Sequence, residues 1–462
     1  MRRRFFWKYN RTPHRGFHRD MNKSSTAIVL GGSIGGLLMA RALSSHFTEV
    51  KIIERDALPP GPLLRKGTPQ CHHAHGLLAS GYRIMDDYFP GMMDELASQG
   101  APRGDVVGDF IWYQYGSWKL RFDSGLQGIT VSRPCLESQL RQHVLALPNV
   151  RLLQNVESLE PSFDTQSQRV TGVRIRHFAD DRHEELAAAL VVDATGRGSN
   201  AIACLKKWGF ATPEAVEVRV NVGYATRVFE RLPGDFKDSM GGIISSSPPQ
   251  GTRYGAVLAA EGNRWVVTLA GVTGDYPPVD EAPWLAFAAS LPVSDVYDLA
   301  IRAKPIGEIK SYRFPANTRF YYEKLKAFPD GFIVTGDAIC SFNPIYGQGM
   351  SVAASEAKAL DECLQESTTS LAKRFYARAA KIIDIPWMIA TGEDLRYPDV
   401  VGKRAPGSRL INRYLESVHH VAGIDETVCR KFFDVLSLLA SPMSLLKPAF
   451  MWHVWKRRRA LS

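Results

Sequence analysis

Residues 26–54 read TAIVLGGSIGGLLMARALSSHFTEVKIIE, and this stretch decides the fold. Residues 26–30 form a short apolar run that ends in glycines, the apolar spacing over 34–46 predicts a helix, and 50–54 form a second apolar run. This order predicts a strand, a glycine-rich turn, a helix and a strand, as in parallel α/β proteins.

The turn is Gly31-Gly32-Ser33-Ile34-Gly35-Gly36, and Glu54 ends the second strand 18 residues later, with Ser33 where the usual fingerprint has its second glycine. Glycines let the backbone approach a pyrophosphate, the helix N-terminus supplies N–H groups, and the terminal acid can bind a ribose. Strand, turn, helix, strand and acid together favour a dinucleotide site over a simple tight turn.

Two later patches have similar features. Residues 190–199, LVVDATGRGS, predict a strand that runs into small residues, although an ordinary strand-to-helix turn explains them equally well. Residues 336–338, GDA, follow an apolar run, and NPIYGQGM (343–350) leads into a helix from about residue 347. An acid at a strand end can bind a ribityl hydroxyl, and the glycines can bring N–H groups to an electron-rich ring.

The composition is that of a globular protein with two or three domains. The chain has 462 residues, of which 45% are hydrophobic and 23% charged. The best candidate for a spanning segment, 435–446, has 12 residues and is interrupted by serines and a proline, whereas a membrane-spanning helix needs about 20. No membrane-spanning segment is therefore expected.

The net charge of +10 is concentrated at the two ends of the chain. Residues 1–23 contribute +7 and Lys456–Arg459 contribute +4, which leaves −1 for the rest. A nearly neutral body does not predict a nucleic-acid groove, so we expect no nucleic-acid partner. Residues 1–23 lack the apolar region of a secretory signal and are interpreted as a basic, disordered extension, with Met21 as an alternative start to Met1.

The cysteines are scattered and favour a reducing compartment. The six, at positions 71, 135, 204, 340, 363 and 429, include no CxxC pair, which is typical of free thiols in the cytosol. We therefore expect a cytoplasmic protein, with a peripheral membrane location as the alternative. Cys71, His72, His73 and His75 form the most metal-like cluster, but no partner pair at ligand spacing appears elsewhere, so we expect no metal site.

The three patches, in this order and at this separation, resemble the FAD-dependent monooxygenases of the para-hydroxybenzoate hydroxylase fold, from about Ala27 to the C-terminal helices. Within that superfamily, residues 64–70 (LRKGTPQ) followed by His73 and His75 look like the branch that contains the flavin epoxidases of polyether biosynthesis. Residues 132–134 (SRP) and 136–137 (LE) also match that branch. The Trp-x-Trp-x-Ile-Pro signature of flavin halogenases is absent.

The resemblance implies an α/β fold with a Rossmann-like FAD-binding domain over 24–209 and 316–365, in which part of 77–132 faces the substrate. An inserted β-sheet substrate domain would cover 210–315, and a helical C-terminal region 366–462. The apolar spacing agrees: it predicts alternating strands at 216–227, 253–260, 264–271 and 308–314, and helical periodicity after 366.

The resemblance also implies an extended FAD, with Glu54 on the adenosine ribose, Arg133 near the cofactor and Asp337 on the ribityl chain. His73, His75 and Tyr346 are the pocket candidates, and no catalytic residue is assigned because the flavin is the reactive group. The expected cofactor-binding residues are Gly31, Gly32, Ser33, Ile34, Gly35, Gly36, Glu54, Arg55, Arg65, Arg133, Asp193, Gly196, Gly336, Asp337, Pro344, Gly347, Gly349 and Met350.

The reaction implied is transfer of one oxygen atom from O2, through a flavin C4a-hydroperoxide, to an alkene (epoxidation) or an electron-rich ring of a lipophilic small molecule, as in secondary metabolism. No second glycine fingerprint exists, so NADPH or NADH would reduce the flavin directly in passing or through a separate flavin reductase. The enzyme alternatives are aromatic hydroxylation and reduction or dehydrogenation of a prenyl chain. A non-catalytic FAD-binding redox sensor is the alternative of another class.

The C-terminal stretch 445–455, followed by KRRR, allows two interpretations. It can form an interfacial helix on anionic headgroups or a last docking helix with a solvated basic tail. The charge pattern favours the docking helix.

Overall fold

The computed structural model describes residues 25–459, and a five-stranded parallel sheet in the order β17-β11-β1-β2-β7 lies at its centre. Both β2 and β11 pair in parallel with β1. Residues 27–30 of β1 are buried without interruption, as in a strand covered on both faces. The strands are β1 (Thr26–Leu30), β2 (Glu49–Glu54), β7 (Val150–Gln154), β11 (Leu190–Asp193) and β17 (Phe332–Val334).

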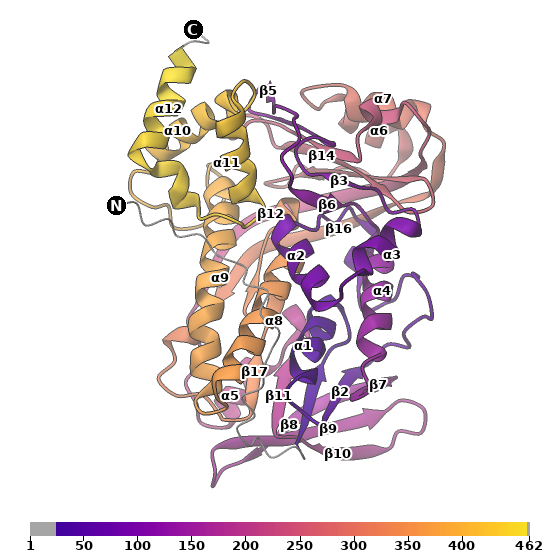
Figure 1. The fold of residues 1–462 in the computed structure, drawn as a ribbon, viewed down its shortest axis with the longest axis vertical. Helices are drawn as coiled ribbons and strands as arrows, with labels where there is room; N and C mark the ends of the chain where they lie inside the picture. Colours follow the sequence, from indigo (N-terminus) through magenta and orange to yellow (C-terminus); the bar gives the residue numbers. More distant parts are fainter. Residues whose placement is uncertain (1–24, 460–462) are drawn as a thin grey trace.

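Helices pack around this sheet (Figure 1). The first helix leaves β1 directly and packs against α4 and α8. The α4 helix begins where Pro134 predicts a start, and the Ser132 hydroxyl accepts a hydrogen bond from the Cys135 N–H as its cap. The helices are α1 (Ile34–Ser44), α2 (Ala79–Tyr88), α3 (Met92–Ser98), α4 (Arg133–Leu145), α5 (Ala201–Lys207) and α8 (Gly349–Glu366).

Two small antiparallel sheets complete this part of the chain, and the first contacts the parallel sheet through β8 and β9. In Figure 1 the first lies at the lower end of the molecule, in the order β10-β9-β8. Its strands are β8 (Val156–Asp164), β9 (Arg169–His177) and β10 (His183–Ala187). The second pairs β3 (Arg103–Asp105) with β6 (Gln127–Ile129).

An eight-stranded sheet in the order β18-β16-β12-β15-β14-β13-β4-β5 forms the second half of the molecule. It extends beyond the predicted insertion 210–315, because β16 continues to Phe320 and strands from earlier and later segments join its two edges. The strands are β4 (Phe110–Gln114), β5 (Ser117–Trp118), β12 (Ala215–Glu230), β13 (Gly241–Ser245), β14 (Arg253–Ala260), β15 (Arg264–Gly271), β16 (Pro305–Phe320) and β18 (Cys340–Ser341).

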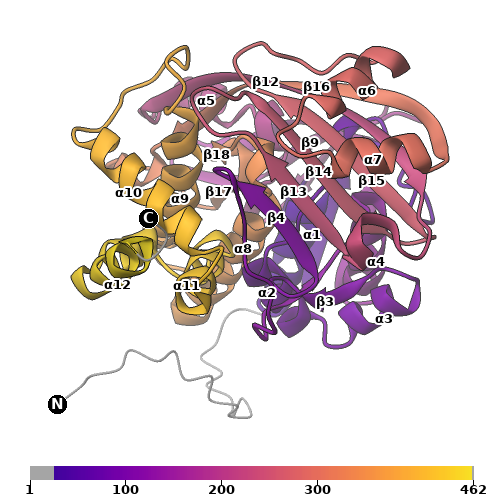
Figure 2. The ribbon, with the colours of Figure 1, turned by 90° about the horizontal axis from the view of Figure 1, so that it is seen from above.

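Two helices pack on this sheet and form a separate core with it. Trp284 of α6 (Glu281–Ala289) and Leu299 of α7 (Asp295–Arg302) are buried against Trp265 and Val267 of β15. Figure 2 shows both helices beside the strands that they cover. The alternating pattern of the strands gave no expectation for α7.

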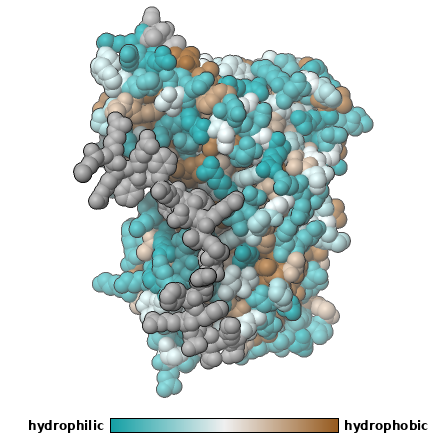
Figure 3. All heavy atoms as spheres, in the orientation of Figure 1, coloured by the Kyte–Doolittle hydropathy of each residue, from teal (hydrophilic) through white to brown (hydrophobic). Residues whose placement is uncertain are grey.

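The C-terminal region is helical, and short 3₁₀ turns punctuate the chain. No helix between residues 25 and 459 is long and apolar enough to cross a membrane. The face drawn in Figure 3 is mostly hydrophilic, with scattered apolar side chains. The C-terminal helices are α9 (Leu371–Asp394), α10 (Ser408–Val421), α11 (Glu426–Leu436) and α12 (Pro448–Arg459). The 3₁₀ turns are η1 (Pro69–His72), η2 (Gly196–Gly198), η3 (Asp235–Asp238), η4 (Tyr322–Lys324), η5 (Gly336–Ala338), η6 (Pro344–Tyr346) and η7 (Pro442–Leu446).

Candidate cofactor and substrate site

The three sequence patches meet at one cavity of about 670 Å³, which begins at the carboxyl ends of β1, β2 and β11 and reaches the eight-stranded sheet. In open α/β sheets, ligands bind outside the carboxyl ends of the strands. Most of the predicted cofactor-binding residues line it: Gly31, Ser33, Ile34, Gly35, Glu54, Arg55, Arg65, Arg133, Asp193, Gly196, Gly336, Asp337, Pro344, Gly347, Gly349 and Met350. The pocket candidates His73 and His75 also line it.

The glycines of the first turn have two different tasks. A Cβ on Gly35 would meet only the Ala353 Cβ at 3.9 Å, so the backbone there is open to a ligand. A Cβ on Gly36 would lie 1.8 Å from the carbonyl oxygen of Gly31, and one on Gly32 would lie 3.2 Å from Glu54. Gly32 and Gly36 are absent from the cavity lining. Because Gly36 has no Cβ, the start of helix α1 can lie close to the Gly31 carbonyl group.

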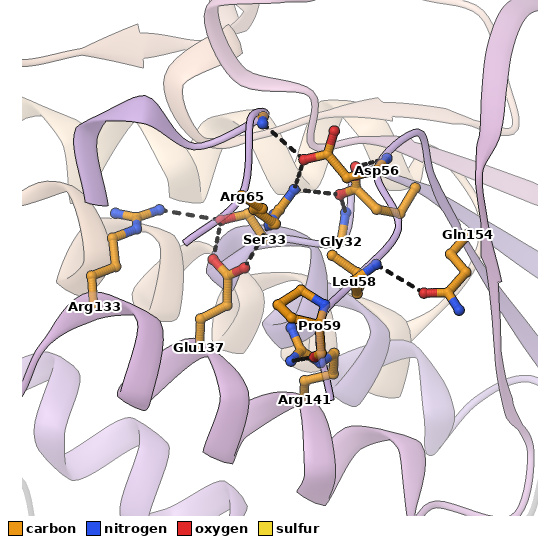
Figure 4. A network of polar contacts seen from close by, with 12 residues as sticks. Gly32, Ser33, Asp56, Leu58, Pro59, Arg65, Arg133, Glu137, Arg141 and Gln154 are labelled. Atoms are coloured by element: carbon orange, nitrogen blue, oxygen red, sulfur yellow. Dashed lines mark hydrogen bonds and ion pairs between the residues drawn. The ribbon is translucent and has the colours of Figure 1, made fainter. Parts of the chain in front are cut away.

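A network of charges holds the loop after β2 against α1 and α4 (Figure 4). The Gly32 N–H donates to Glu54 Oε2 at 2.8 Å, which orients that carboxylate at the strand end. Arg65, almost fully buried, lies 3.3 Å from Glu54, 2.9 Å from Asp56 and 3.0 Å from Glu137. Three carboxylates around one guanidinium fix the loop in place.

The same network reaches the helix N-terminus. The Ser33 hydroxyl donates to Glu137 Oε2 at 2.7 Å and accepts from Arg133 Nη2 at 3.2 Å. The buried Nε of Arg133 has no hydrogen-bond partner among the described residues. A cation beside α1 with an unused donor fits the phosphates of a dinucleotide. Glu137 and Asp56 are absent from the predicted site, because neither pairing follows from spacing along the chain.

The histidines of the 69–76 loop are neutral at physiological pH. Burial, followed by the charge of His72, lowers the pKa of His73 to about 4. Burial, followed by Arg133, lowers the pKa of His75 to about 3, and His75 Nδ1 lies 2.8 Å from the His73 carbonyl oxygen. His73 Nδ1 lies 2.7 Å from the Thr226 hydroxyl, which ties the loop to β12 of the eight-stranded sheet.

Aromatic side chains surround His73 on the side of the large sheet. Its ring centroid is 5.9 Å from that of Tyr224 and 5.7 Å from that of Tyr312, and both tyrosines line the cavity together with Phe314. Arg197 of the middle patch hydrogen-bonds to the Tyr312 hydroxyl. This end of the cavity is therefore mainly aromatic, and the Arg197 guanidinium lies over the Tyr312 and Phe314 rings.

In the middle patch, the Asp193 carboxylate stabilises the turn that follows β11. Asp193 Oδ1 accepts from the Thr195 N–H at 3.0 Å, and Asp193 Oδ2 accepts from the Ser199 hydroxyl at 2.7 Å. Gly196, which has a φ of 70°, is half-buried and lines the cavity at this turn.

In the third patch, the buried carboxyl of Glu356 holds the backbone before Asp337 in place. Glu356 Oε2 of α8 accepts from the Thr335 hydroxyl at 2.6 Å and from the Gly336 N–H at 2.7 Å. Burial raises the pKa of Glu356 to about 7. Asp337 is open to the cavity but otherwise enclosed, and this desolvation raises its pKa while Arg197 and Arg133 oppose the rise. The contacts leave the Asp337 carboxyl facing the cavity.

A second buried acid holds the turn η6. Asp394, at the end of α9, accepts from Asn317 Nδ2 at 2.7 Å, Asn343 Nδ2 at 3.0 Å and the Tyr346 hydroxyl at 2.8 Å. Tyr346 therefore points away from the cavity, which it does not line. The Tyr224 hydroxyl donates to Asn343 Oδ1 at 3.0 Å, so the network touches the substrate end. Asp394 gives no signal in the sequence, since it lies inside a helix 48 residues after Tyr346.

No group of three or more His, Cys, Asp or Glu over residues 25–459 is arranged to hold a metal ion. The six cysteines are free and buried. Burial raises the pKa of the Cys71 thiol, which disfavours the thiolate that a metal would bind.

No family model matches the chain. Among solved structures, a flavoprotein/dehydrogenase from Cytophaga hutchinsonii superposes with a TM-score of 0.68 at 15% identity, over 95% of this chain and 100% of that one. The flavin-dependent brominase Bmp2 gives 0.65 at 13% identity, over 95% and 100%. The p-nitrophenol 4-monooxygenase PnpA from Pseudomonas putida DLL-E4 gives 0.63 at 18% identity, over 90% and 99%. These likenesses confirm the predicted fold class.

A curated relative extends the likeness to the sequence. Protein Rv3254 of Mycobacterium tuberculosis (strain ATCC 25618 / H37Rv) is 32% identical over 438 residues, which cover 91% of this chain and 92% of that protein. At this identity and coverage the two sequences are related along nearly their whole length. The chain therefore belongs to the family of Protein Rv3254.

Proposed function

We propose that the chain is an FAD-dependent monooxygenase that transfers one oxygen atom from O2 to an alkene or an electron-rich ring of a lipophilic small molecule. The observation that carries the proposal is the convergence of three distant patches, at residues 31–36, 193–197 and 336–350, on one cavity in a flavoprotein fold. FAD, when bound, supplies the redox chemistry that activates O2.

The residues around the cavity fit the parts of FAD. The open backbone at Gly35, the N-terminus of α1 and the unused donor of Arg133 suit the pyrophosphate. Glu54, oriented by the Gly32 N–H, suits the ribose hydroxyls, and Asp337 suits the ribityl hydroxyls. The backbone of Gly347, Gly349 and Met350 is then left for the flavin ring.

The aromatic end of the cavity supports a lipophilic, uncharged substrate. Tyr224, Tyr312 and Phe314 offer apolar surface, and neutral His73 offers one imidazole nitrogen beyond the one bound to Thr226. Epoxidation or hydroxylation by an activated oxygen asks the protein to position the substrate and exclude water rather than to supply a strong acid–base pair. The polyether-epoxidase branch remains our narrower proposal, with NADPH or NADH as donor, directly or through a flavin reductase.

The test is rapid mixing of chemically reduced, FAD-loaded protein with oxygenated buffer while the flavin absorbance is recorded. We expect a transient spectrum that precedes the oxidised one. Incubation with polyenes or phenols under ¹⁸O2 should then give a product with one labelled oxygen atom. A product heavier by two hydrogens would identify a reductase, and reduced FAD that reoxidises without consuming any substrate would favour a redox sensor.

A further inference from the structure

Three packed elements near the C-terminus expose a concentration of large apolar side chains. The α10 and α12 helices pack against each other, and the Tyr414 hydroxyl of α10 donates to the Leu445 carbonyl oxygen of η7 at 2.6 Å. Of the seventeen large apolar side chains exposed over residues 25–459, six belong to these elements. We call them the C-terminal apolar surface: Leu410, Ile411, Met443, Met451, Trp452 and Trp455.

Two tryptophans dominate this surface. Trp452 is 63% exposed and stacks on Trp455, with ring centroids 4.7 Å apart, while Val454 on the other side of α12 is 1% exposed. Val454 therefore packs α12 against the rest of the protein, and the two tryptophans face outward. Tryptophan has a large apolar body and one N–H donor, which suits the boundary between water and lipid.

The same elements are strongly basic. Between them, α10, α12 and the end of η7 carry seven Lys or Arg and a single carboxylate, Glu416. Arg457 pairs with Asp425 of the neighbouring α11 at 2.6 Å, and Glu416 lies 3.6 Å from Arg396 of the preceding segment. A net positive charge therefore surrounds the tryptophans. The basic residues are Arg409, Arg413, Lys447, Lys456, Arg457, Arg458 and Arg459.

We propose that the C-terminal apolar surface docks the protein on an anionic lipid bilayer, with the tryptophan pair among the headgroups and the basic side chains against the lipid charges. In both Figure 1 and Figure 2, α10 and α12 lie together at one outer edge of the molecule, where a flat surface can reach them. Apolar side chains are visible near the upper end of the face in Figure 3, in the region of these helices.

An anionic bilayer fits this surface better than a second copy of the chain. Two copies that meet through this surface would bring two basic clusters together, which opposes association. A bilayer with acidic headgroups satisfies both properties at once, since it accepts the apolar side chains and attracts the cations. The proposal departs from the docking-helix interpretation that the charge pattern favours, and it does so because Trp452 and Trp455 are exposed while Val454 is buried.

The test is sedimentation of the full chain with vesicles of phosphatidylcholine that contain roughly one phosphatidylserine in three lipids. The variant Trp452→Ser/Trp455→Ser and the variant Lys447→Glu/Lys456→Glu should each lower binding about tenfold. The matched controls Phe178→Ser/Leu232→Ser and Lys206→Glu/Lys326→Glu change exposed residues far along the chain and should bind as the unchanged protein does. Far-ultraviolet circular dichroism verifies that every variant is folded.

The outcomes separate the proposal from its rivals. Residues 1–23 keep their charge of +7 in every variant, so binding through that segment would survive both pairs of substitutions and would overturn the proposal. Equal binding to pure phosphatidylcholine would remove the role of charge and would also overturn it. The third outcome is a protein that does not bind vesicles and sediments as a dimer, while the Trp452→Ser/Trp455→Ser variant sediments as a monomer. That result would assign the surface to self-association instead.

Discussion

At the scale of single residues, buried carboxyls organise the site and make it sensitive to pH. Glu356 is fully buried, and its Oε1 has no hydrogen-bond partner within residues 25–459. Its ordinary pKa of 4.5 rises to about 7 in the folded chain, so the native state holds a proton that the unfolded state releases. The stability associated with this group is complete below about pH 4.5 and is lost as the pH rises through about 7.

Glu356→Gln therefore should change the pH dependence of stability. Glutamine imitates the protonated acid, since its carbonyl can accept from Thr335 and Gly336. The free energy of unfolding should match the unchanged protein near pH 5 and exceed it by up to about 3 kcal/mol above pH 8. Urea unfolding at both pH values measures this, with Glu362→Gln on the exposed side of α8 as control. Parallel pH profiles would show that Glu356 does not hold the proton.

Asp337→Ala tests the residue assigned to the ribityl chain. The side chain faces the cavity and makes no contact that the fold needs, so the variant should fold. Loss of a charged hydrogen-bond acceptor should weaken FAD binding by roughly tenfold or more. The FAD content after purification and a fluorescence titration measure it, with Asp330→Ala on the exposed surface as control. An unchanged FAD affinity would contradict the assignment.

At the scale of elements, the two adjacent glycines in the first turn of α1, Gly35 and Gly36, are expected to behave oppositely. Gly36→Val should prevent stable folding, because its Cβ would lie 1.8 Å from the Gly31 carbonyl oxygen. Gly35→Val should fold and lose FAD, because its side chain would enter the open cavity. Soluble yield, thermal melting and FAD content distinguish the two. A folded, FAD-free Gly36→Val protein would restore a direct role for Gly36 at the cofactor.

The contact between α9 and η6 is the second test at this scale. Asp394→Ala leaves the donors of Asn317, Asn343 and Tyr346 without their acceptor. We expect a stability loss of about 2–4 kcal/mol and weaker FAD binding, since the turn before α8 loses its support. Chemical unfolding and FAD titration measure the two effects. Asp384→Ala, on the exposed side of the same helix, should leave FAD affinity unchanged.

The local patterns explain why part of this organisation was predictable. The run from residue 26 to 54 predicts its elements because strand, turn and helix periods are local, and the observed β1, α1 and β2 agree. The pairings of Arg65 with Glu137 and of Tyr346 with Asp394 depend on elements that only tertiary packing brings together. The α7 helix and the strands β4 and β18 were missed for a different reason, since short segments carry weak periodicity.

At the scale of the whole molecule, the cavity lies between two bodies with separate hydrophobic cores. One body supplies the turn of α1, and the other supplies Tyr224 of β12 and Tyr312 of β16. The loop around His73 is tied to the second body through Thr226 and also lines the cavity beside the first. A ligand that fills this space should stabilise the two bodies together. Free FAD at about 100 times its Kd should add about 2.7 kcal/mol to the free energy of unfolding.

Hydrogen exchange with and without FAD tests this coupling. Protection should rise in residues 31–36 and 336–350 and also in the 69–76 loop and in β12, which line the far end of the cavity. The outer helix α7 packs on the opposite side of the large sheet and should exchange at the same rate in both samples. Protection confined to the parallel sheet and α1 would mean that FAD does not stabilise the 69–76 loop or the large sheet. That result would contradict the proposal that one cavity holds both FAD and substrate.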